Sequence, residues 1–140
     1  MSKSTEELVK ELGLCSDFQR FYRENQDAMI TTSLSELRTA LLEQHGLTKV
    51  DVIGRSEMSE VYGYQIFSGK RLPERGKLLC LALAMELNLE EVQQVLRAAG
   101  YSPLYVKLPA DSVVIYGFCR HLTVLQVNNM LYEYGLDTLE

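Results

Sequence analysis

Apolar residues recur every three or four positions through most of this 140-residue chain. This is the spacing of one face of an α-helix. Strict alternation of apolar and polar residues, which is typical of a half-buried strand, occurs only in the short and ambiguous stretch 113–118. Glycine and proline fall mostly where one periodic segment ends and the next begins. The pattern therefore predicts an all-α protein.

Capping residues divide the chain into eight or nine predicted helices. A Ser, Thr, Asp or Asn before a segment can accept a hydrogen bond from the first free backbone N–H groups, and glycine is common where a helix ends. Ser33, Ser59, Asp111 and Thr123 are predicted caps of this kind. The predicted helices cover about 5–12, 18–25, 34–45, 49–55, 60–67, 75–87, 89–99, 112–121 and 124–134.

Three segments follow from this division. They are an N-terminal helical extension (1–33), a central domain (34–100) and a C-terminal helical pair (101–140), which begins with a loop that contains two prolines. The apolar and aromatic residues of the C-terminal pair either close the core or form a dimer interface, and the sequence leaves both alternatives open. These residues are Tyr116, Val124, Val127, Leu131, Tyr132 and Tyr134.

Two short helices joined by a short connection stand at the centre of the chain. Segments 49–55 and 60–67 have the length and spacing of a helix-turn-helix. A basic cluster follows, in which Lys70, Arg71, Arg75 and Lys77 accompany a single acid within eight residues. Alone, such a cluster is typical of a solvated loop; after a helix-turn-helix, it favours contacts to phosphate.

The central segment resembles a known family. Residues 66–73 read IFSGKRLP, which is similar to the Gly-Lys-Arg-x-Pro segment that recurs after the recognition helix of the lambda-repressor-like (XRE-type) helix-turn-helix family. The resemblance continues without gaps over 47–91, and with the helix from Leu34 it covers about 60 of the 140 residues. Segments 98–105 and 131–135 extend it to a group of mostly uncharacterised XRE-type regulators from Firmicutes.

The resemblance implies a five-helix DNA-binding core and a sequence-specific transcriptional regulator, with repression as the expected mode. The helix that begins after Ser59 would lie in the major groove of double-stranded DNA. A homodimer is also expected, because one recognition helix reads few bases. The residues placed to contact base edges are Glu60, Val61, Tyr64 and Gln65, and those placed to contact phosphates are Lys49, Ser59, Ser68, Lys70, Arg71 and Arg75.

Four positions depart from the family pattern. Family members commonly carry Gln at the position of Lys49, Ala at that of Ile53, Gly at that of Glu57 and a β-branched residue at that of Gly63. The turn position of Glu57 is expected to take a left-handed backbone, which suits glycine. A glycine inside a helix, as at residue 63, costs roughly 1 kcal/mol relative to alanine.

The net charge of −5 opposes indiscriminate binding to nucleic acid, because attraction to phosphates dominates that mode. It favours a second hypothesis, in which the helix-turn-helix scaffold is a protein–protein interaction module with little or no DNA binding. Glu57 and Glu60 beside the recognition helix and the acidic C-terminal third support this alternative. No H-E-x-x-H, Walker-type or G-x-S-x-G motif occurs, so neither catalysis nor a metal or cofactor site is expected.

The cysteines and the hydropathy of the chain bear on its location. Cys15, Cys80 and Cys119 are far apart in the sequence, and each lies in an apolar helical pattern. They are interpreted as reduced core residues of a cytoplasmic protein. No run of about 18 apolar residues and no signal-peptide pattern is found, so neither export nor a membrane span is expected.

Overall fold

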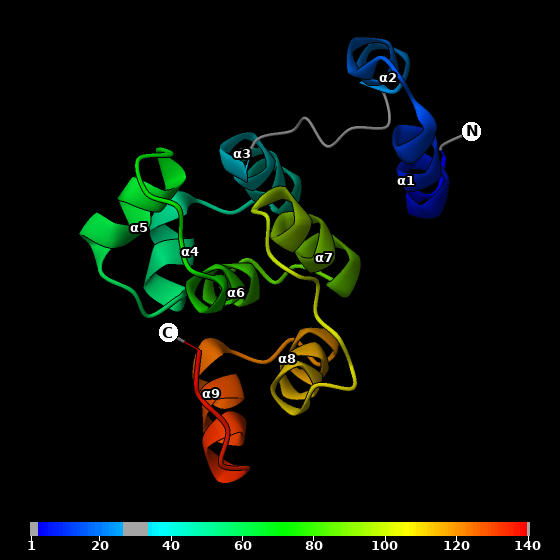
Figure 1. The fold of residues 1–140 in the computed structure, drawn as a ribbon. Coiled ribbons are helices and arrows are strands. Elements are labelled where there is room, and N and C mark those ends of the chain that lie inside the picture. The colour runs from blue at the N-terminus through cyan, green and yellow to red at the C-terminus, as the bar shows by residue number, and fades with distance from the viewer. Residues whose placement is uncertain (1–2, 27–33, 140) are drawn as a thin grey trace. The chain divides into compact units, whose positions relative to one another are not determined.

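The computed structural model describes residues 3–26 and 34–139, which belong to two separate compact units. All regular secondary structure within these ranges is helical, so the predicted all-α class is confirmed for them. Helices α1 and α2 belong to the first unit and α3 to α9 to the second (Figure 1). The helices are α1 (Thr5–Leu14), α2 (Phe18–Glu24), α3 (Leu34–His45), α4 (Lys49–Arg55), α5 (Glu60–Phe67), α6 (Arg75–Ala84), α7 (Leu89–Ala98), α8 (Pro109–Cys119) and α9 (Val124–Glu133).

Most of the described helices have an N-cap residue whose side chain accepts a hydrogen bond from the first turn. The oxygens of Asn88 and Thr123 accept hydrogen bonds from the third backbone N–H of α7 and α9, and the side chains of Glu91 and Gln126 bond back to the cap residues. These are capping boxes, which satisfy two free backbone donors at once. The predicted cap at Thr123 is thus confirmed, whereas that at Ser33 lies outside the described residues.

The predicted cap at Asp111 is wrong. Helix α8 begins three residues earlier than predicted, with Leu108 as its N-cap and Pro109 at its first position, where the missing N–H of proline carries no penalty. The Asp111 carboxylate instead accepts hydrogen bonds from Arg75 and from the backbone N–H of Tyr105. The ambiguous stretch 113–118 lies within α8 and is helical.

The Arg75–Asp111 ion pair joins the start of α6 to α8. Arg75 Nη2 lies 3.2 Å from Asp111 Oδ2, and the carboxylate is almost fully buried. The same guanidinium donates to the backbone carbonyls of Ser102 and Pro103 in the loop between α7 and α8. Arg75 therefore joins this loop to the start of α6 and to α8.

Helices α8 and α9 share one core with α3 to α7. Every residue of α6 from Leu78 to Ala84 is buried, and side chains of both C-terminal helices pack into the same cluster. Val124, Val127 and Leu131 are at most 2% exposed, so these three residues close the core rather than form a dimer surface, which is one of the two alternatives that the sequence left open. Their helical spacing could not distinguish an interface from this core. The exposed members of that predicted surface are Tyr116, Tyr132 and Tyr134.

The three cysteines do not share one environment. Cys80 is buried in α6, and burial raises the pKa of its thiol to about 11. Cys15 and Cys119 are exposed, so their assignment to the core was wrong. Cys15 is the residue that caps the end of α1 and Cys119 is the last residue of α8. No helix among the described residues combines the length and the apolar character needed to cross a membrane.

Arg38 is a buried cation in α3. Its residue is only 3% exposed, and its Nε and Nη1 atoms have no hydrogen-bond partner. The guanidinium carbon lies 5.9 Å from the centre of the Phe67 ring. Burial lowers the pKa of Arg38 well below its ordinary value, to about 10. A shift of this size corresponds to a free-energy cost of about 3 kcal/mol for keeping Arg38 charged in the folded protein.

Arg38→Met is therefore expected to increase the free energy of unfolding by about 1–2 kcal/mol at neutral pH. Methionine keeps the apolar stem and removes the charge, while loss of the contact to the Phe67 ring offsets part of the gain. Arg38→Lys keeps a buried charge and is the matched control, with no increase expected. Urea unfolding of both variants measures the difference, and a Met variant less stable than the wild type would contradict this account of Arg38.

Candidate nucleic-acid interface

Helix α5 presents one buried side and one open side. Gly63, Ile66 and Phe67 face the core, where α5 contacts α3 and α4 (Figure 1). On the other side, Val61 is 70% exposed and Tyr64 is 43% exposed. The exposed positions are polar or lie beside polar residues. Helix α5 is thus held from behind by α3 and α4, and Val61 and Tyr64 on its outer side are exposed.

The turn between α4 and α5 fixes where α5 begins. The Ser59 hydroxyl accepts a hydrogen bond from the backbone N–H of Tyr62 at 3.2 Å, so Ser59 is the predicted N-cap. Glu57 has a φ of 61°, which confirms the left-handed backbone expected at this turn. A side chain in this conformation is strained because its Cβ lies too close to the following carbonyl oxygen.

Glu57→Gly is expected to raise the free energy of unfolding by about 1 kcal/mol, because glycine adopts the left-handed backbone without this strain. The corresponding rise in melting temperature is about 3 °C for a domain of this size. Glu60→Gly removes the same side chain from the first turn of α5, where the backbone is helical. This control is expected to lower stability, and a fall in stability for Glu57→Gly would contradict the prediction.

Helices α4 and α5 approach each other closely at Gly63. A Cβ atom added there would lie 2.7 Å from Ile53 Cγ1 and 2.8 Å from Ile53 Cγ2, which is closer than packed carbon atoms come. The Ile53 side chain, 2% exposed, therefore occupies the space that a side chain at residue 63 would need. The large side chain of Ile53 and the missing side chain of Gly63 are therefore matched in volume across the α4–α5 contact.

The outer side of α5 borders a shallow depression. It contains all four residues predicted to contact base edges and three of the six predicted to contact phosphates. Its lining is formed by Lys49, Glu60, Val61, Tyr64, Gln65, Ser68 and Lys70. Residues from α4, from α5 and from the segment after α5 thus form one continuous surface.

The segment after α5 is held by its backbone. The Gln65 carbonyl accepts hydrogen bonds from the N–H groups of Lys70 (3.0 Å) and Arg71 (3.2 Å). The Arg71 guanidinium lies 5.1 Å from the centre of the Tyr62 ring, a cation–π contact. This contact of Arg71 was not predictable from the sequence, because it depends on the chain turning back after Gly69.

Of the other predicted phosphate-contacting residues, Ser59 and Arg71 are exposed, whereas Arg75 is not part of this surface. The Arg75 guanidinium is bound to Asp111 and to two backbone carbonyls. Its sequence position within the basic cluster gave no sign of these partners, which lie 27 or more residues away.

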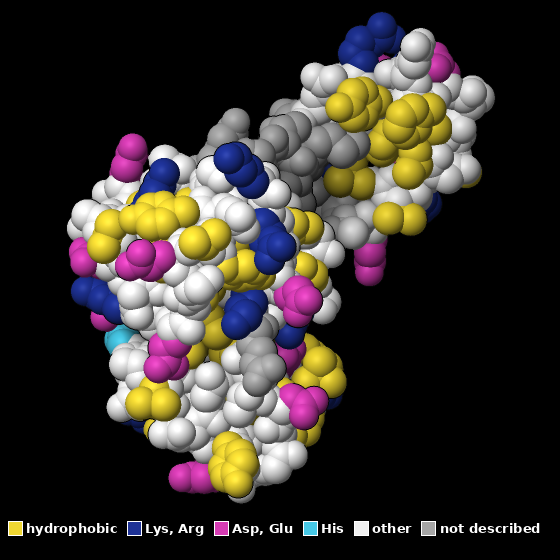
Figure 2. All heavy atoms as spheres, turned by 90° about the vertical axis from the view of Figure 1, so that its left-hand side faces the viewer, with side chains coloured by type: hydrophobic (Ala, Val, Ile, Leu, Met, Phe, Trp, Pro, Cys, Tyr) yellow, Lys and Arg dark blue, Asp and Glu magenta, His cyan; other side chains and the backbone are white. Residues whose placement is uncertain are grey.

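The surface around α5 carries both signs of charge. Figure 2 views the side of the core on which α5 lies, and dark blue and magenta side chains are interspersed there around a yellow patch. Glu60 in the first turn of α5 is favourable to the helix dipole but repels phosphate. Lys49, Lys70 and Arg71 are the cations at this surface that an anionic partner could contact.

No family model, curated protein or solved structure matches the chain. Nor do the described residues contain a group of three His, Cys, Asp or Glu side chains placed to hold a metal ion.

Proposed function

We propose that the protein is a sequence-specific DNA-binding transcriptional regulator, with repression as its expected mode, and that α5 enters the major groove. The observation that carries the proposal is the single depression in which Glu60, Val61, Tyr64 and Gln65 lie together with Lys49, Ser68 and Lys70. A helix held from behind, with an open outer side and cations at its margin, has the form required for groove binding.

The open side of α5 offers groups that can distinguish bases. The Gln65 amide can bond to adenine in a bidentate manner, the Glu60 carboxylate can accept from the amino group of cytosine, and the Val61 methyls can contact the methyl group of thymine. Val61 is the most exposed apolar residue of α5. The chemistry of this side is therefore mixed, as direct readout of several different base pairs requires.

Phosphate contacts would position α5 without reading sequence. Lys49 at the start of α4 and Lys70 after α5 would bind the backbone on either side of the groove, and Arg71 is oriented by the Tyr62 ring. The hydroxyl groups of Ser59 and Ser68 would add contacts to the same strands. Arg75 is left out of the proposed set because of its ion pair with Asp111.

Two copies of the chain would read a longer site than one. Half-sites about 34 Å apart, one turn of DNA, raise both affinity and specificity. The exposed tyrosines of α8 and α9, Tyr116, Tyr132 and Tyr134, are the proposed contacts between copies. Sedimentation of the full chain with and without a palindromic site checks this arrangement, and a single copy bound per site would contradict it.

The second candidate is a protein–protein interaction module that uses the same surface. It is favoured by the exposed apolar side chains of Val61 and Tyr64 next to the acidic Glu60. Such a surface can dock a partner without any phosphate contact.

The salt dependence of binding to mixed genomic DNA distinguishes the two candidates. Each phosphate contact releases condensed counterions, so the logarithm of the affinity falls by about 0.9 per contact for each tenfold rise in salt. Three or more contacts, from Lys49, Lys70 and Arg71 alone, predict a slope of about −3 or steeper. No association with DNA even at low salt would reject the regulator and favour the interaction module.

A further inference from the structure

Six of the described helices in the larger unit end in the same way, and two of these six ends are exceptions in their sequence. Within residues 34–139, six helices end in the same pair of backbone hydrogen bonds, in which a residue with positive φ follows the last turn. Glycine occupies that position after α3, α5, α7 and α9, as it does in most such motifs. After α6 and α8 the residues are Glu86 (φ 56°) and His121 (φ 54°). At both positions, a glycine would be less strained than the residue that is present.

The two exceptions line the same cleft. It has a volume of about 400 Å³ and lies where the end of α4, the end of α6 and the turn between α8 and α9 meet. The volume falls in the range of small-molecule sites. The full lining is Arg55, Leu83, Ala84, Glu86, His121, Leu122, Thr123 and Val124. Strained residues cluster at functional sites more often than elsewhere, so this coincidence points to a ligand.

The cleft combines an apolar floor with two opposite charges. Leu83, Ala84 and Val124 are buried and form its floor. At its margin, Arg55 Nη1 lies 3.8 Å from Glu86 Oε2, and both side chains are more than half exposed. A long and exposed ion pair of this kind stabilises the fold little. Most donors of Arg55 and one carboxylate oxygen of Glu86 therefore stay available to a bound molecule.

We propose that this cleft binds a free α-amino acid with an apolar side chain. The ligand carboxylate would bind the Arg55 guanidinium, and its ammonium group would bind the Glu86 carboxylate. Each charged group of the ligand would then face a protein group of opposite charge, next to the ion pair that Arg55 and Glu86 already form. The ligand side chain would cover the apolar floor of the cleft. An internal peptide segment lacks both charged groups, and a peptide terminus lacks one of them, so the match is to the free amino acid.

Titration of the full chain with L-leucine, followed by amide NMR, tests the proposal. The resonances of Leu83, His121 and Val124 are expected to shift with saturation. Isocaproate lacks the ammonium group of leucine, and isoamylamine lacks its carboxylate. Each is expected to bind at least about tenfold more weakly than leucine. Absence of shifts at the cleft, or equal binding of all three molecules, would overturn the proposal.

Two glycine substitutions separate binding from backbone strain. Glu86→Gly removes the proposed ammonium ligand and relieves a left-handed residue, whereas Glu57→Gly relieves the same strain outside the cleft. Both variants are expected to melt at a higher temperature than the wild type. Only Glu86→Gly is expected to lose leucine binding, by about tenfold or more. Undiminished binding by Glu86→Gly, or an equal loss in both variants, would overturn the assignment.

Discussion

Replacing Lys70 and Arg71 together by glutamate is expected to weaken binding to DNA roughly 100-fold or more, which corresponds to about 2.7 kcal/mol. Both residues follow α5 at the margin of the proposed groove-binding surface, and their backbone N–H groups are held by the Gln65 carbonyl. The change removes two phosphate contacts and places two negative charges near the duplex. The plot of the logarithm of the affinity against the logarithm of the salt concentration should also become less steep, by about two units of slope.

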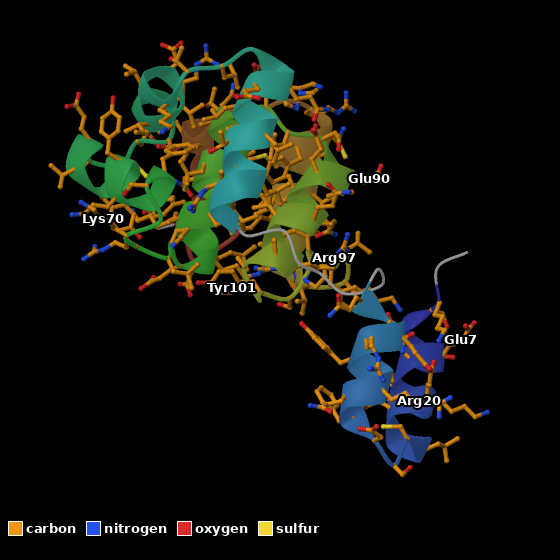
Figure 3. The ribbon with its side chains drawn as sticks, turned by 90° about the horizontal axis from the view of Figure 1, so that it is seen from above. Glu7, Arg20, Lys70, Glu90, Arg97 and Tyr101 are labelled. Carbon is orange, nitrogen blue, oxygen red and sulfur yellow. The ribbon has the colours of Figure 1, made fainter. Side chains whose placement is uncertain are left out.

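The matched control reverses two cations elsewhere in the same unit. Arg97 in α7 and Lys107 in the loop before α8 are exposed, and neither lines the α5 depression. Figure 3 shows Lys70 beside α5 and Arg97 on the far side of the core. Arg97→Glu with Lys107→Glu changes the net charge by the same amount. This pair is expected to weaken binding by less than about threefold, because exposed charges beyond a Debye length are screened.

The DNA affinity of both double variants is measured by fluorescence anisotropy, with a DNA site identified by genomic footprinting. Thermal unfolding checks that both variants are folded. Loss of the Arg71–Tyr62 contact is expected to lower stability only slightly. Unchanged affinity of folded Lys70→Glu/Arg71→Glu protein would exclude this surface from DNA binding. An equal loss in both pairs would mean that overall charge, and not this surface, governs the interaction.

Local signals in the sequence were sufficient to predict where most helices lie. Ser59 and Thr123 cap the helices that follow them. Each of these features depends on residues within one helical turn of one another. Short-range chemistry of this kind can be read from one stretch of sequence, without knowledge of the fold.

Features that depend on distant residues were missed. Asp111 has the chemistry of a cap, but its carboxylate instead pairs with Arg75, 36 residues away. The same pairing removes Arg75 from the basic cluster to which its sequence position assigned it. Likewise, the spacing of Val127 and Leu131 identified an apolar face on α9 but not what covers it. The spacing of apolar residues identifies which face of a helix is buried. Which element packs against that face depends on the whole fold.

The pair Ile53 and Gly63 gives the sharpest test of how α5 is held. Gly63→Val is expected to lower the free energy of unfolding by about 3 kcal/mol, at the upper end for overpacking, because the new side chain would overlap Ile53. Ile53→Ala alone is expected to cost about 2–4 kcal/mol by leaving a cavity in the core. Both residues are buried, so solvent cannot relieve either change.

The double variant Ile53→Ala/Gly63→Val is expected to recover most of the lost stability. The alanine substitution removes as many carbon atoms as the valine substitution adds, and on the same side of the α4–α5 contact, so the core volume is conserved. A coupling free energy of at least about 2 kcal/mol between the two changes should result. Urea unfolding of the two single variants and the double variant measures it. Additive effects would show that Ile53 does not fill the space beside Gly63, and that α5 is positioned by its other neighbours.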